Sequence, residues 1–411
     1  MIALLYVWVL CNIPALVAGL KRVRRREQRA NKGARECEEK LPEFSIIVPV
    51  KDEERVVDRI LNALLNLDYP WKKREIIVVD DGSADGTAEI CRDYVGRHPD
   101  QIRYLQRPTS DGKPSALNYA FRHAKGEIIA TFDADSVPEP DALLVAAECF
   151  EDSAVAAVQG RIGSINADEN MLTKCVSHEM AVFYDAFLRG KGALDLFVPL
   201  AGTCQFIRRD VLVETGGWDE GSLSEDMELS ARLVEKGFKI GYAPEIRAWQ
   251  EYPASISGFI KQRARWFRGC MKVALSYGKL LTKLNRRCID AEIMLFGSYM
   301  FILYLACLFM ATFTFLVPSN LIFASLAQIT SLLMMTGLLL VGVAMSIVAK
   351  PRKLSNILWI PFVYLYVTVQ SFISIFALVQ IALNRPKTWT KTVKTGRVTV
   401  NGKRIRNPNN T

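Results

Sequence analysis

Three long apolar stretches near the end of the chain constrain its fold more than any other feature. They cover residues 291–316, 321–348 and 356–383, and a short VPSN loop and a basic KPRK loop separate them. A helix of about 20 apolar residues is long enough to cross the ~30 Å hydrocarbon core of a bilayer. We therefore expect about three transmembrane helices within residues 289–384.

A further apolar stretch, residues 1–20, opens the sequence, and the basic run KRVRRR follows it directly. A cleavable signal peptide carries its positive charge before the apolar stretch, so this order predicts an uncleaved transmembrane anchor. The positive-inside rule places the residues after it in the cytosol. The sequence thus predicts a multi-pass protein of the cell membrane, with a basic linker at 21–42 and a cytosolic catalytic domain.

The same charge rule conflicts with the end of the chain. One anchor and three spans would leave the basic tail, residues 385–411, on the outer side of the membrane. Two solutions stay open at this point. Either one stretch is re-entrant or interfacial, with the last one the candidate because it contains Pro361, or the tail is exported.

The charge and residue composition indicate which kinds of partner the protein can bind. The net charge is +9, and much of the positive charge flanks apolar segments, which predicts contact with anionic membrane lipids. Nucleic acid is not expected, because no base-stacking aromatic pattern accompanies the charge. The nine cysteines and three histidines show no metal-ligand spacing, which argues against zinc. Nothing in the sequence fixes an oligomeric state.

Strand-like and helix-like segments alternate over residues 43–250. Apolar β-branched runs at 44–50, 75–79, 102–106 and 127–135 are separated by segments with helical spacing. Unbroken apolar strands in such an alternation predict an α/β fold with a Rossmann-like, mostly parallel sheet that helices cover on both faces. Because such sheets bind ligands beyond the carboxyl ends of their strands, the polar residues that follow the strands are the candidate site.

Two acidic pairs occupy such positions. Asp80 and Asp81 follow the second strand. A tight turn would explain two such residues there. Alternatively, a buried pair of carboxylates can accept hydrogen bonds from the N–H or hydroxyl groups of a ligand. Asp133 and Asp135 end the fourth predicted strand, and residues two apart on a strand point the same way. Together with the oxygens of a bound diphosphate, the two carboxylates are expected to coordinate Mg²⁺ or Mn²⁺.

Two helix starts carry further charged candidates. Lys113 precedes Pro114 at the first turn of a predicted helix, where either an anion compensates it or it is an exposed surface lysine. Ser222 and Glu225 fit a capping box at the start of another helix. Asp226, in the same turn, is a candidate general base.

The stretch KQRARWFR, residues 261–268, lies in a predicted interfacial segment at 251–288. On a helix Gln262 and Trp266 lie four residues apart, and Arg265 is next to them. One interpretation is an amphipathic helix at the membrane surface with snorkelling arginines. The other is one wall of an active site.

Taken in order, the motifs DDGS at 80, DAD at 133, SED at 224 and QRARW at 262 resemble the family-two glycosyltransferases with membrane domains. This group contains cellulose, chitin, hyaluronan and poly-N-acetylglucosamine synthases and ceramide glucosyltransferase. GKPSALN at 112 and LAGTCQFIRR at 200 add to the resemblance, which covers roughly residues 42–280. It implies a GT-A catalytic domain and inverting transfer from a nucleotide diphospho-sugar, with a UDP-sugar as the first expectation.

The resemblance also implies roles for individual residues. Asp80 and Asp81 would hold the donor nucleoside, with Glu53, Lys113 and Asp133 nearby, and Asp133 and Asp135 would bind the metal ion. Asp226 would be the catalytic base. The diphosphate and acceptor would be held by Gln262, Arg263, Arg265, Trp266, Gly202, Thr203 and Glu225. Two departures from the family pattern are Ser224 in place of the usual Thr, and the absence of the usual Cys before Gly202.

The acceptor stays open between two classes. The first expectation is a growing polysaccharide at the cytosolic membrane face; the alternative is the transfer of a single sugar to a membrane lipid. Four apolar stretches are few for a complete polysaccharide channel, so transfer to a membrane lipid stays a second hypothesis. A non-catalytic membrane scaffold is a third hypothesis, and the presence of Asp135, Asp226 and Arg265 argues against it.

Overall fold

The computed structural model describes residues 2–26, 40–317, 321–349, 354–386, 392, 394–396, 399–400 and 403–404. The chain forms two compact units, each built from three segments. The sheet unit comprises Gln28–Ser177, Phe197–Ala254 and Lys391–Thr411, and the helical unit comprises Met1–Glu27, His178–Leu196 and Ser255–Thr390. The predicted domain over 43–250 is thus interrupted, because the segment His178–Leu196 packs with the helices.

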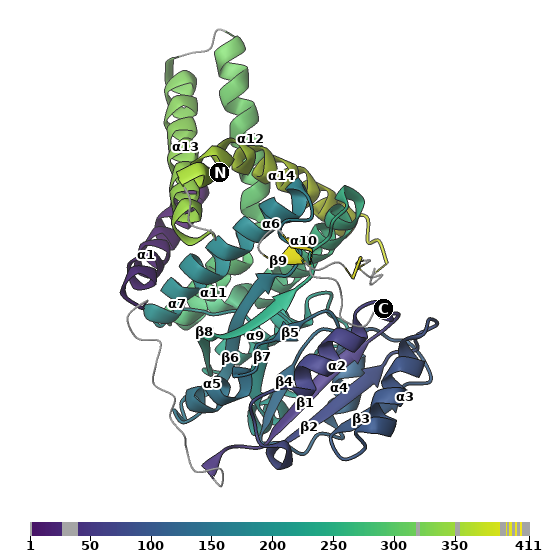
Figure 1. The fold of residues 1–411 in the computed structure, drawn as a ribbon. Helices are drawn as coiled ribbons and strands as arrows, with labels where there is room; N and C mark the ends of the chain where they lie inside the picture. The colour runs from purple at the N-terminus through teal and green to yellow at the C-terminus, as the bar shows by residue number, and fades with distance from the viewer. Residues whose placement is uncertain are drawn as a thin grey trace. The chain divides into compact units, whose positions relative to one another are not determined.

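The sheet unit contains an eight-stranded sheet in the order β3-β2-β1-β4-β7-β6-β8-β5 (Figure 1). Its strands are β1 Phe44–Val50, β2 Arg74–Asp80, β3 Ile102–Gln106, β4 Ile128–Thr131, β5 Val137–Pro138, β6 Val155–Ser164, β7 Gln205–Arg208 and β8 Lys239–Gln250. Strands β1, β2, β3 and β4 pair in parallel with one another, whereas β7 runs antiparallel to both β4 and β6. The predicted α/β fold with a mostly parallel sheet is confirmed.

The helices of this unit follow the strands as the alternation predicts. They are α2 Val57–Leu65, α3 Thr87–Arg97, α4 Lys113–Phe121, α5 Ala142–Cys149, α8 Arg209–Thr215 and α9 Glu225–Glu235, with a short 3₁₀ turn, η2, at Trp71–Lys73. In α2 the residues at helical spacing, Val57, Ile60, Leu61 and Leu64, are buried. A short antiparallel pair, β9 Thr399–Val400 and β10 Lys403–Arg404, completes the unit.

The direction of the first four strands positions the candidate site. Strand β1 is buried along almost its whole length, and β2 and β4 pair with it in parallel on either side. The carboxyl ends of β1, β2, β3 and β4 therefore meet at one edge of the sheet. Asp80 ends β2, and the loops that follow β1, β2 and β4 carry the candidate residues Glu53, Asp81, Asp133 and Asp135.

The helical unit begins with α1 Ile2–Arg26, which forms over the predicted anchor. Its other elements are the π-helix η3 Val182–Leu188, α7 Arg189–Ala193, α10 Ile256–Tyr277, η4 Gly278–Lys283, α11 Arg286–Leu295, α12 Gly297–Leu316, α13 Leu321–Val348, η5 Leu354–Trp359 and α14 Ile360–Ala382. The helix α6, Met171–Ala181, starts in the sheet unit and ends in the helical unit.

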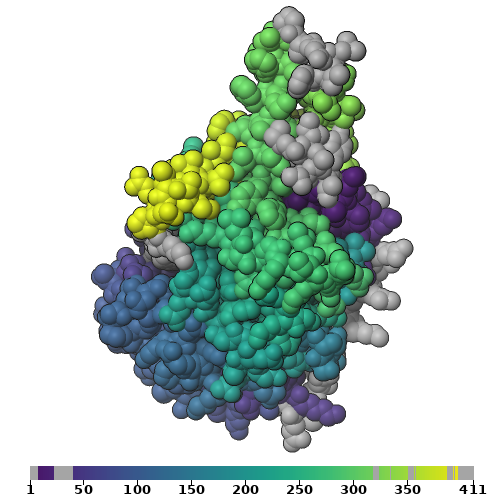
Figure 2. All heavy atoms as spheres, turned by 180° about the vertical axis from the view of Figure 1, so that it is seen from behind, coloured from purple at the N-terminus to yellow at the C-terminus, as the bar shows by residue number. Residues whose placement is uncertain are grey.

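Three helices among the described residues are long and apolar enough to cross a membrane: α12 over its full length, residues Ala324–Val348 of α13, and α14. Large side chains of α12, including Phe309, Phe313 and Phe315, face outward, and part of this surface is visible in green in Figure 2. The predicted span at 291–316 is divided, because α11 ends at Leu295 and α12 begins at Gly297. Pro361 lies in the first turn of α14, where proline is tolerated, so it does not interrupt this helix.

The backbone of α1 touches the segment Val182–Ala193 at two points. A methyl group added at Gly19 would collide with the carbonyl oxygen of Ala186, and one added at Gly190 would collide with the carbonyl oxygen of Ala15. Two helices can approach this closely only where a residue has no side chain. Small residues on both partners thus hold the N-terminal helix against this segment.

A buried ion pair lies in the same unit. Lys191 Nζ is 2.7 Å from both carboxylate oxygens of Asp290, and Lys191 is 1% exposed. Burial lowers the pKa of Lys191, and the Asp290 carboxylate offsets only part of this effect. Such a pair holds α7 to α11, and it is costly to break because one charge would remain buried without a partner.

Candidate active site

Lys113, in the first turn of α4, contacts two carboxylates of the predicted site. Its ammonium nitrogen lies 2.6 Å from Asp133 Oδ1 and 3.3 Å from Glu225 Oε1, and it donates a 3.1 Å hydrogen bond to the carbonyl oxygen of Gly202. Burial alone would lower the pKa of Lys113, but the Asp133 and Glu225 carboxylates outweigh it and raise the pKa. Lys113 is therefore a half-buried, charged member of the site, not an exposed surface lysine.

Gly202 lies where Lys113 and Asp226 meet. A methyl group added at Gly202 would lie 3.0 Å from Lys113 Nζ and 3.2 Å from Asp226 Oδ2. The φ of Gly202 is +76°, a conformation that favours glycine. The other carboxylate oxygen of Asp226, Oδ1, accepts a 2.8 Å hydrogen bond from the backbone N–H of Met227. The structure thus brings the Asp226 carboxylate, the Lys113 ammonium and the Gly202 backbone to one point.

The start of α9 differs from the predicted capping box. The helix begins at Glu225 with Ser224 as its N-cap residue, and Ser222 instead accepts a 3.2 Å hydrogen bond from the backbone N–H of Ser224. Three acidic residues, Glu225, Asp226 and Glu228, lie in the first turn of α9. Acidic side chains there are stabilised by the helix dipole, so the turn can present Glu225 and Asp226 to Lys113.

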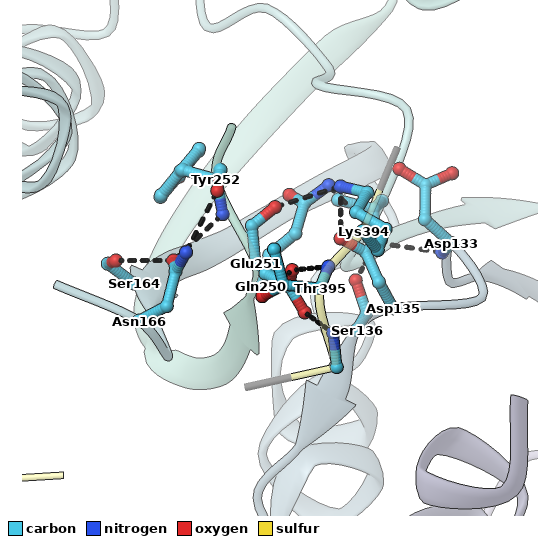
Figure 3. Close-up of polar contacts among 12 residues, drawn as sticks. Asp133, Asp135, Ser136, Ser164, Asn166, Gln250, Glu251, Tyr252, Lys394 and Thr395 are labelled. Carbon is cyan, nitrogen blue, oxygen red and sulfur yellow. Dashed lines mark hydrogen bonds and ion pairs between the residues drawn. The ribbon is translucent and has the colours of Figure 1, made fainter. Parts of the chain in front are cut away.

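The DAD motif also departs from the prediction that its two aspartates lie on a strand and point the same way. Strand β4 ends at Thr131, so Asp133 and Asp135 lie in the turn that follows. Asp133 contacts Lys113, whereas Asp135 accepts hydrogen bonds from Lys394 Nζ at 2.5 Å and Gln250 Nε2 at 3.4 Å (Figure 3). The two carboxylates therefore face two different ammonium groups.

Thr203 supports the same turn. Its hydroxyl oxygen accepts a 3.0 Å hydrogen bond from the backbone N–H of Asp133, and it lies 2.7 Å from the hydroxyl oxygen of Ser136. Both hydroxyl groups are buried. The predicted acceptor residue Thr203 thus fixes the backbone between the two aspartates.

A short tail segment binds beside Asp135. Lys394 also donates a 2.8 Å hydrogen bond to the carbonyl oxygen of Glu251, and Figure 3 shows that Thr395 contacts the Glu251 side chain. That carboxylate accepts hydrogen bonds from the Thr395 hydroxyl at 2.9 Å and from the Gly396 N–H at 3.1 Å, and also from the Thr395 N–H. Burial alone would lower the pKa of Lys394, but Asp135 outweighs it and raises the pKa.

Glu251 and Lys394 were not among the predicted site residues. Glu251 directly follows β8, so the rule that selects polar residues after strands would have found it. Asn166 holds the next residue, Tyr252, through side-chain hydrogen bonds of 2.9 Å and 3.0 Å to its backbone (Figure 3). No local sequence signal pairs Lys394 with Asp135.

The Asp80 carboxylate accepts hydrogen bonds from neighbouring protein groups. One carboxylate oxygen accepts hydrogen bonds from the N–H and hydroxyl of Ser83, at 2.8 Å and 2.7 Å, and the other accepts a 2.6 Å bond from the Tyr104 hydroxyl. Its contacts match the turn interpretation. Glu53, in the loop after β1, accepts backbone hydrogen bonds from residues 56 and 57 at its own carbonyl, and its charge acts on Lys394.

Asp81 holds the loop that leads into α4. Its carboxylate pairs with the Arg107 guanidinium and accepts hydrogen bonds from the Ser110 hydroxyl at 2.8 Å and the Gly112 N–H at 3.0 Å. Both Asp81 and Arg107 are buried. Because Gly112 directly precedes Lys113, Asp81 also sets the position at which α4 and its lysine begin.

The QRARW motif lies on α10, in the helical unit. Gln262 and Arg263 are buried, while Arg265 and Trp266 are half-buried. The guanidinium of Arg263 pairs with Glu179, and that of Arg268 donates to the backbone carbonyls of Arg385 and Pro386. The interpretation of the arginines as snorkelling side chains does not describe Arg263 and Arg268, because both have partners inside the protein.

Comparison with known proteins identifies related chains. The family model described as "Glycosyltransferase like family 2" matches residues 42–269. The chain is 32% identical over 273 residues to the "Probable glycosyltransferase YdaM" of Bacillus subtilis (strain 168), a match that covers 66% of this chain and 65% of that protein. The chain is 34% identical over 257 residues to the "Beta-monoglucosyldiacylglycerol synthase" of Trichormus variabilis, covering 61% of this chain and 53% of that protein.

A third relative is the "Poly-beta-1,6-N-acetyl-D-glucosamine synthase" of Staphylococcus epidermidis, which is 30% identical over 233 residues, with 56% of this chain and 55% of that protein covered. The matches thus span less than two thirds of the length of these relatives.

Among solved structures, the mannosyltransferase PcManGT of Pyrobaculum calidifontis, in complex with GDP-Man and Mn²⁺, superposes with a TM-score of 0.59 at 20% identity. The superposition covers 94% of this chain and 99% of that one, which confirms the predicted GT-A type of fold. The family model covers more than half of the sequence and contains the DDGS, DAD, SED and QRARW motifs discussed above. The protein belongs to the family-two glycosyltransferases.

Proposed function

We propose that the protein transfers a sugar from a nucleotide diphospho-sugar to an acceptor hydroxyl at a membrane surface, with inversion at the anomeric carbon. The observation that carries the proposal is the meeting of Lys113, Asp133 and Asp226 at the Gly202 backbone. A half-buried cation that can pair with a diphosphate there lies next to a carboxylate that can accept a proton. Membership of the family supports this chemistry.

Asp226 is the proposed general base. Its Oδ2 takes the proton of the acceptor hydroxyl while the hydroxyl oxygen bonds to the anomeric carbon on the face opposite the diphosphate. The bond from that carbon to the diphosphate oxygen breaks, and its electron pair stays on the diphosphate. The backbone N–H of Met227 holds Oδ1 and leaves Oδ2 oriented toward Gly202.

Asp133 and Asp135 would hold Mg²⁺ or Mn²⁺. Their carboxylates are hard oxygen ligands, and each binds a lysine ammonium, which supports a cation site there. The described residues contain no cluster of three or more His, Cys, Asp or Glu side chains that could hold a metal ion alone, so donor oxygens would complete the coordination. Such an ion would stabilise the negative charge on the leaving diphosphate.

The donor nucleoside is proposed to bind beside Asp81 and Glu53, in the loops after β2 and β1. Asp81 fixes the loop that carries Arg107 and Gly112, and Glu53 lies near Lys394. Asp80 would act indirectly, by holding the turn after β2 through Ser83 and Tyr104.

The motif on α10 is proposed to clamp the diphosphate and to support the acceptor sugar. Gln262, Arg265 and Trp266 are the residues that match this role in the family, and a planar guanidinium can bind two phosphate oxygens at once. Arg263 is not included, because Glu179 already pairs with its guanidinium.

Two acceptor classes are supported by different relatives. The match to a poly-N-acetylglucosamine synthase supports our first expectation, elongation of a polysaccharide at the cytosolic face. The match to a monoglucosyldiacylglycerol synthase supports the alternative, transfer of one sugar to a membrane lipid. The apolar helices α12, α13 and α14, with α1 as an N-terminal anchor, would hold the site at the membrane in either case.

The test uses the full-length protein in lipid nanodiscs with radiolabelled UDP- and GDP-sugars, with and without Mg²⁺ or Mn²⁺. A ladder of products on a sizing gel would identify a polymerase, and one mobile lipid-soluble band would identify a glycolipid synthase. Failure to transfer any of these sugars to either acceptor would reject the proposed function.

A further inference from the structure

Glu179, near the end of α6, is a residue that no sequence motif indicated and that gathers three donors. Its Oε2 pairs with the guanidinium of Arg263 and accepts a 2.7 Å hydrogen bond from the Tyr366 hydroxyl. Its Oε1 accepts a 3.2 Å hydrogen bond from the Gln370 side chain. One carboxylate therefore joins α6, α10 and α14 inside the helical unit.

Arg263 depends on this carboxylate. Its side chain is 5% exposed, and its guanidinium lies 5.3 Å from the centre of the Phe259 ring and 4.7 Å from that of Trp266. Contact of a guanidinium with aromatic rings is energetically favourable, but burial of a cation without a counter-ion is unfavourable. The Glu179 carboxylate thus holds the Arg263 guanidinium in a buried position where its charge lies against the Trp266 ring.

The candidate span α14 supplies the other two donors. Tyr366 and Gln370 are four residues apart, so they lie on the same face of the helix. The Tyr366 ring also packs 5.5 Å from the Phe259 ring of α10. Polar side chains on an apolar span are costly unless they have a defined partner, and here that partner is Glu179.

We propose that Glu179 is a positioning residue for the reaction: it holds Arg263, and through Arg263 it fixes the orientation of Trp266. This rests on the proposed function, in which Trp266 supports the acceptor sugar. Loss of the carboxylate charge would let the Arg263 guanidinium leave the rings, and Trp266 would lose one packing face. The acceptor would then be misplaced, while the donor site in the sheet unit would keep its own contacts.

Glu179→Gln is the first test, made in the full-length protein in nanodiscs. We expect kcat to fall by about tenfold or more, because a small misplacement of a reactant is costly, while the KM for the donor stays within about twofold. Asp290→Asn is the matched control, because it breaks another buried ion pair of the helical unit, the one between α7 and α11. It should lower thermal stability with little change in kcat per folded molecule.

Two further variants guard against a simple folding defect. Tyr366→Phe removes only the phenol hydrogen bond and should lower kcat in the same direction but less. Glu179→Gln combined with Arg263→Gln should be no slower than the slower single variant, because both act through the same contact. Additive losses in the double variant, or an unchanged kcat in Glu179→Gln, would overturn the proposal.

A fluorescence measurement separates this inference from the proposed function. Acrylamide quenching is compared in Glu179→Gln and the wild type, each with and without Trp266→Phe, so that the difference reports Trp266. Greater quenching of Trp266 in Glu179→Gln is expected whether or not the assay contains the right sugar. Equal quenching would reject the link from Glu179 to Trp266, whereas an inactive wild type would reject only the proposed reaction.

Discussion

Lys394 and Asp135, 259 positions apart in the sequence, form an ion pair of 2.5 Å in the sheet unit. The pair places a cation from the tail on one of the two carboxylates proposed to bind the metal ion. A lysine ammonium and a divalent cation compete for the same oxygens. Lys394→Met should therefore tighten Mn²⁺ binding about five- to tenfold when no nucleotide is present, measured by calorimetric titration.

Lys125→Met is the control for this prediction, because Lys125 is an exposed lysine of the same unit, so its loss changes the net charge equally. It should leave the affinity for Mn²⁺ unchanged. Weaker binding in Lys394→Met would show that the lysine helps the cation to bind, which is the opposite of competition.

Asp226→Asn should abolish most turnover while the donor still binds. An amide cannot accept the proton of the acceptor hydroxyl, and loss of a general base lowers kcat by about 10²–10⁴-fold. Asp210→Asn is a matched control, because Asp210 also lies in a first helical turn and its Oδ1 accepts a 2.8 Å bond from the next N–H. Unchanged turnover in Asp226→Asn would reject the assignment of the base.

Gly202→Ala should damage both stability and activity. Its φ of +76° strains any residue with a side chain, at roughly 1–2 kcal/mol, and the added methyl would press on Lys113 and Asp226. Gly237→Ala is the control, because Gly237 has a φ of +91° and an added methyl would meet nothing within 4 Å. We expect both variants to lower the melting temperature by a similar amount, and only Gly202→Ala to lose turnover. Equal turnover in the two variants would show that Gly202 has no role in the reaction.

Glu292, in α11, predicts a dependence of stability on pH. It is 1% exposed, neither carboxylate oxygen has a hydrogen-bond partner among the described residues, and burial raises its pKa to about 7. Between the usual carboxyl pKa and 7 the unfolded state releases a proton that the folded state retains, so this group lowers stability as the pH rises through that window.

Glu292→Gln removes this titration. As the pH rises from 5 to 8, the variant should become more stable relative to the wild type by about 1–3 kcal/mol. The melting temperature in nanodiscs, measured at both values, tests this. A difference between variant and wild type that is the same at pH 5 and pH 8 would show that Glu292 does not titrate in this range.

Local patterns predicted the regular elements well. Strands β1 and β3 begin and end where their apolar runs do, and α13 coincides with the apolar stretch 321–348. Buried parallel strands and long apolar helices are continuous in sequence, so their bounds can be read from it. The site edge was predictable for the same reason, because it follows from the direction of β1, β2 and β4.

Contacts between distant segments could not be predicted in this way. The positions of Lys394 on Asp135 and of Glu179 on Arg263 depend on tertiary packing, and neither pair shares a sequence motif. The orientation of Asp133 and Asp135 was wrong because β4 ends earlier than its apolar pattern, and a turn does not keep the alternation of a strand.

The close contact of Gly19 with Ala186, and of Gly190 with Ala15, has a consequence for chimeric proteins. A generic hydrophobic leader of equal length would insert into a bilayer but could not seat against the Val182–Ala193 segment, since its larger side chains would force the two backbones apart. The N-terminal helix of this transferase is thus a fitted part of its helical unit and not an exchangeable tether.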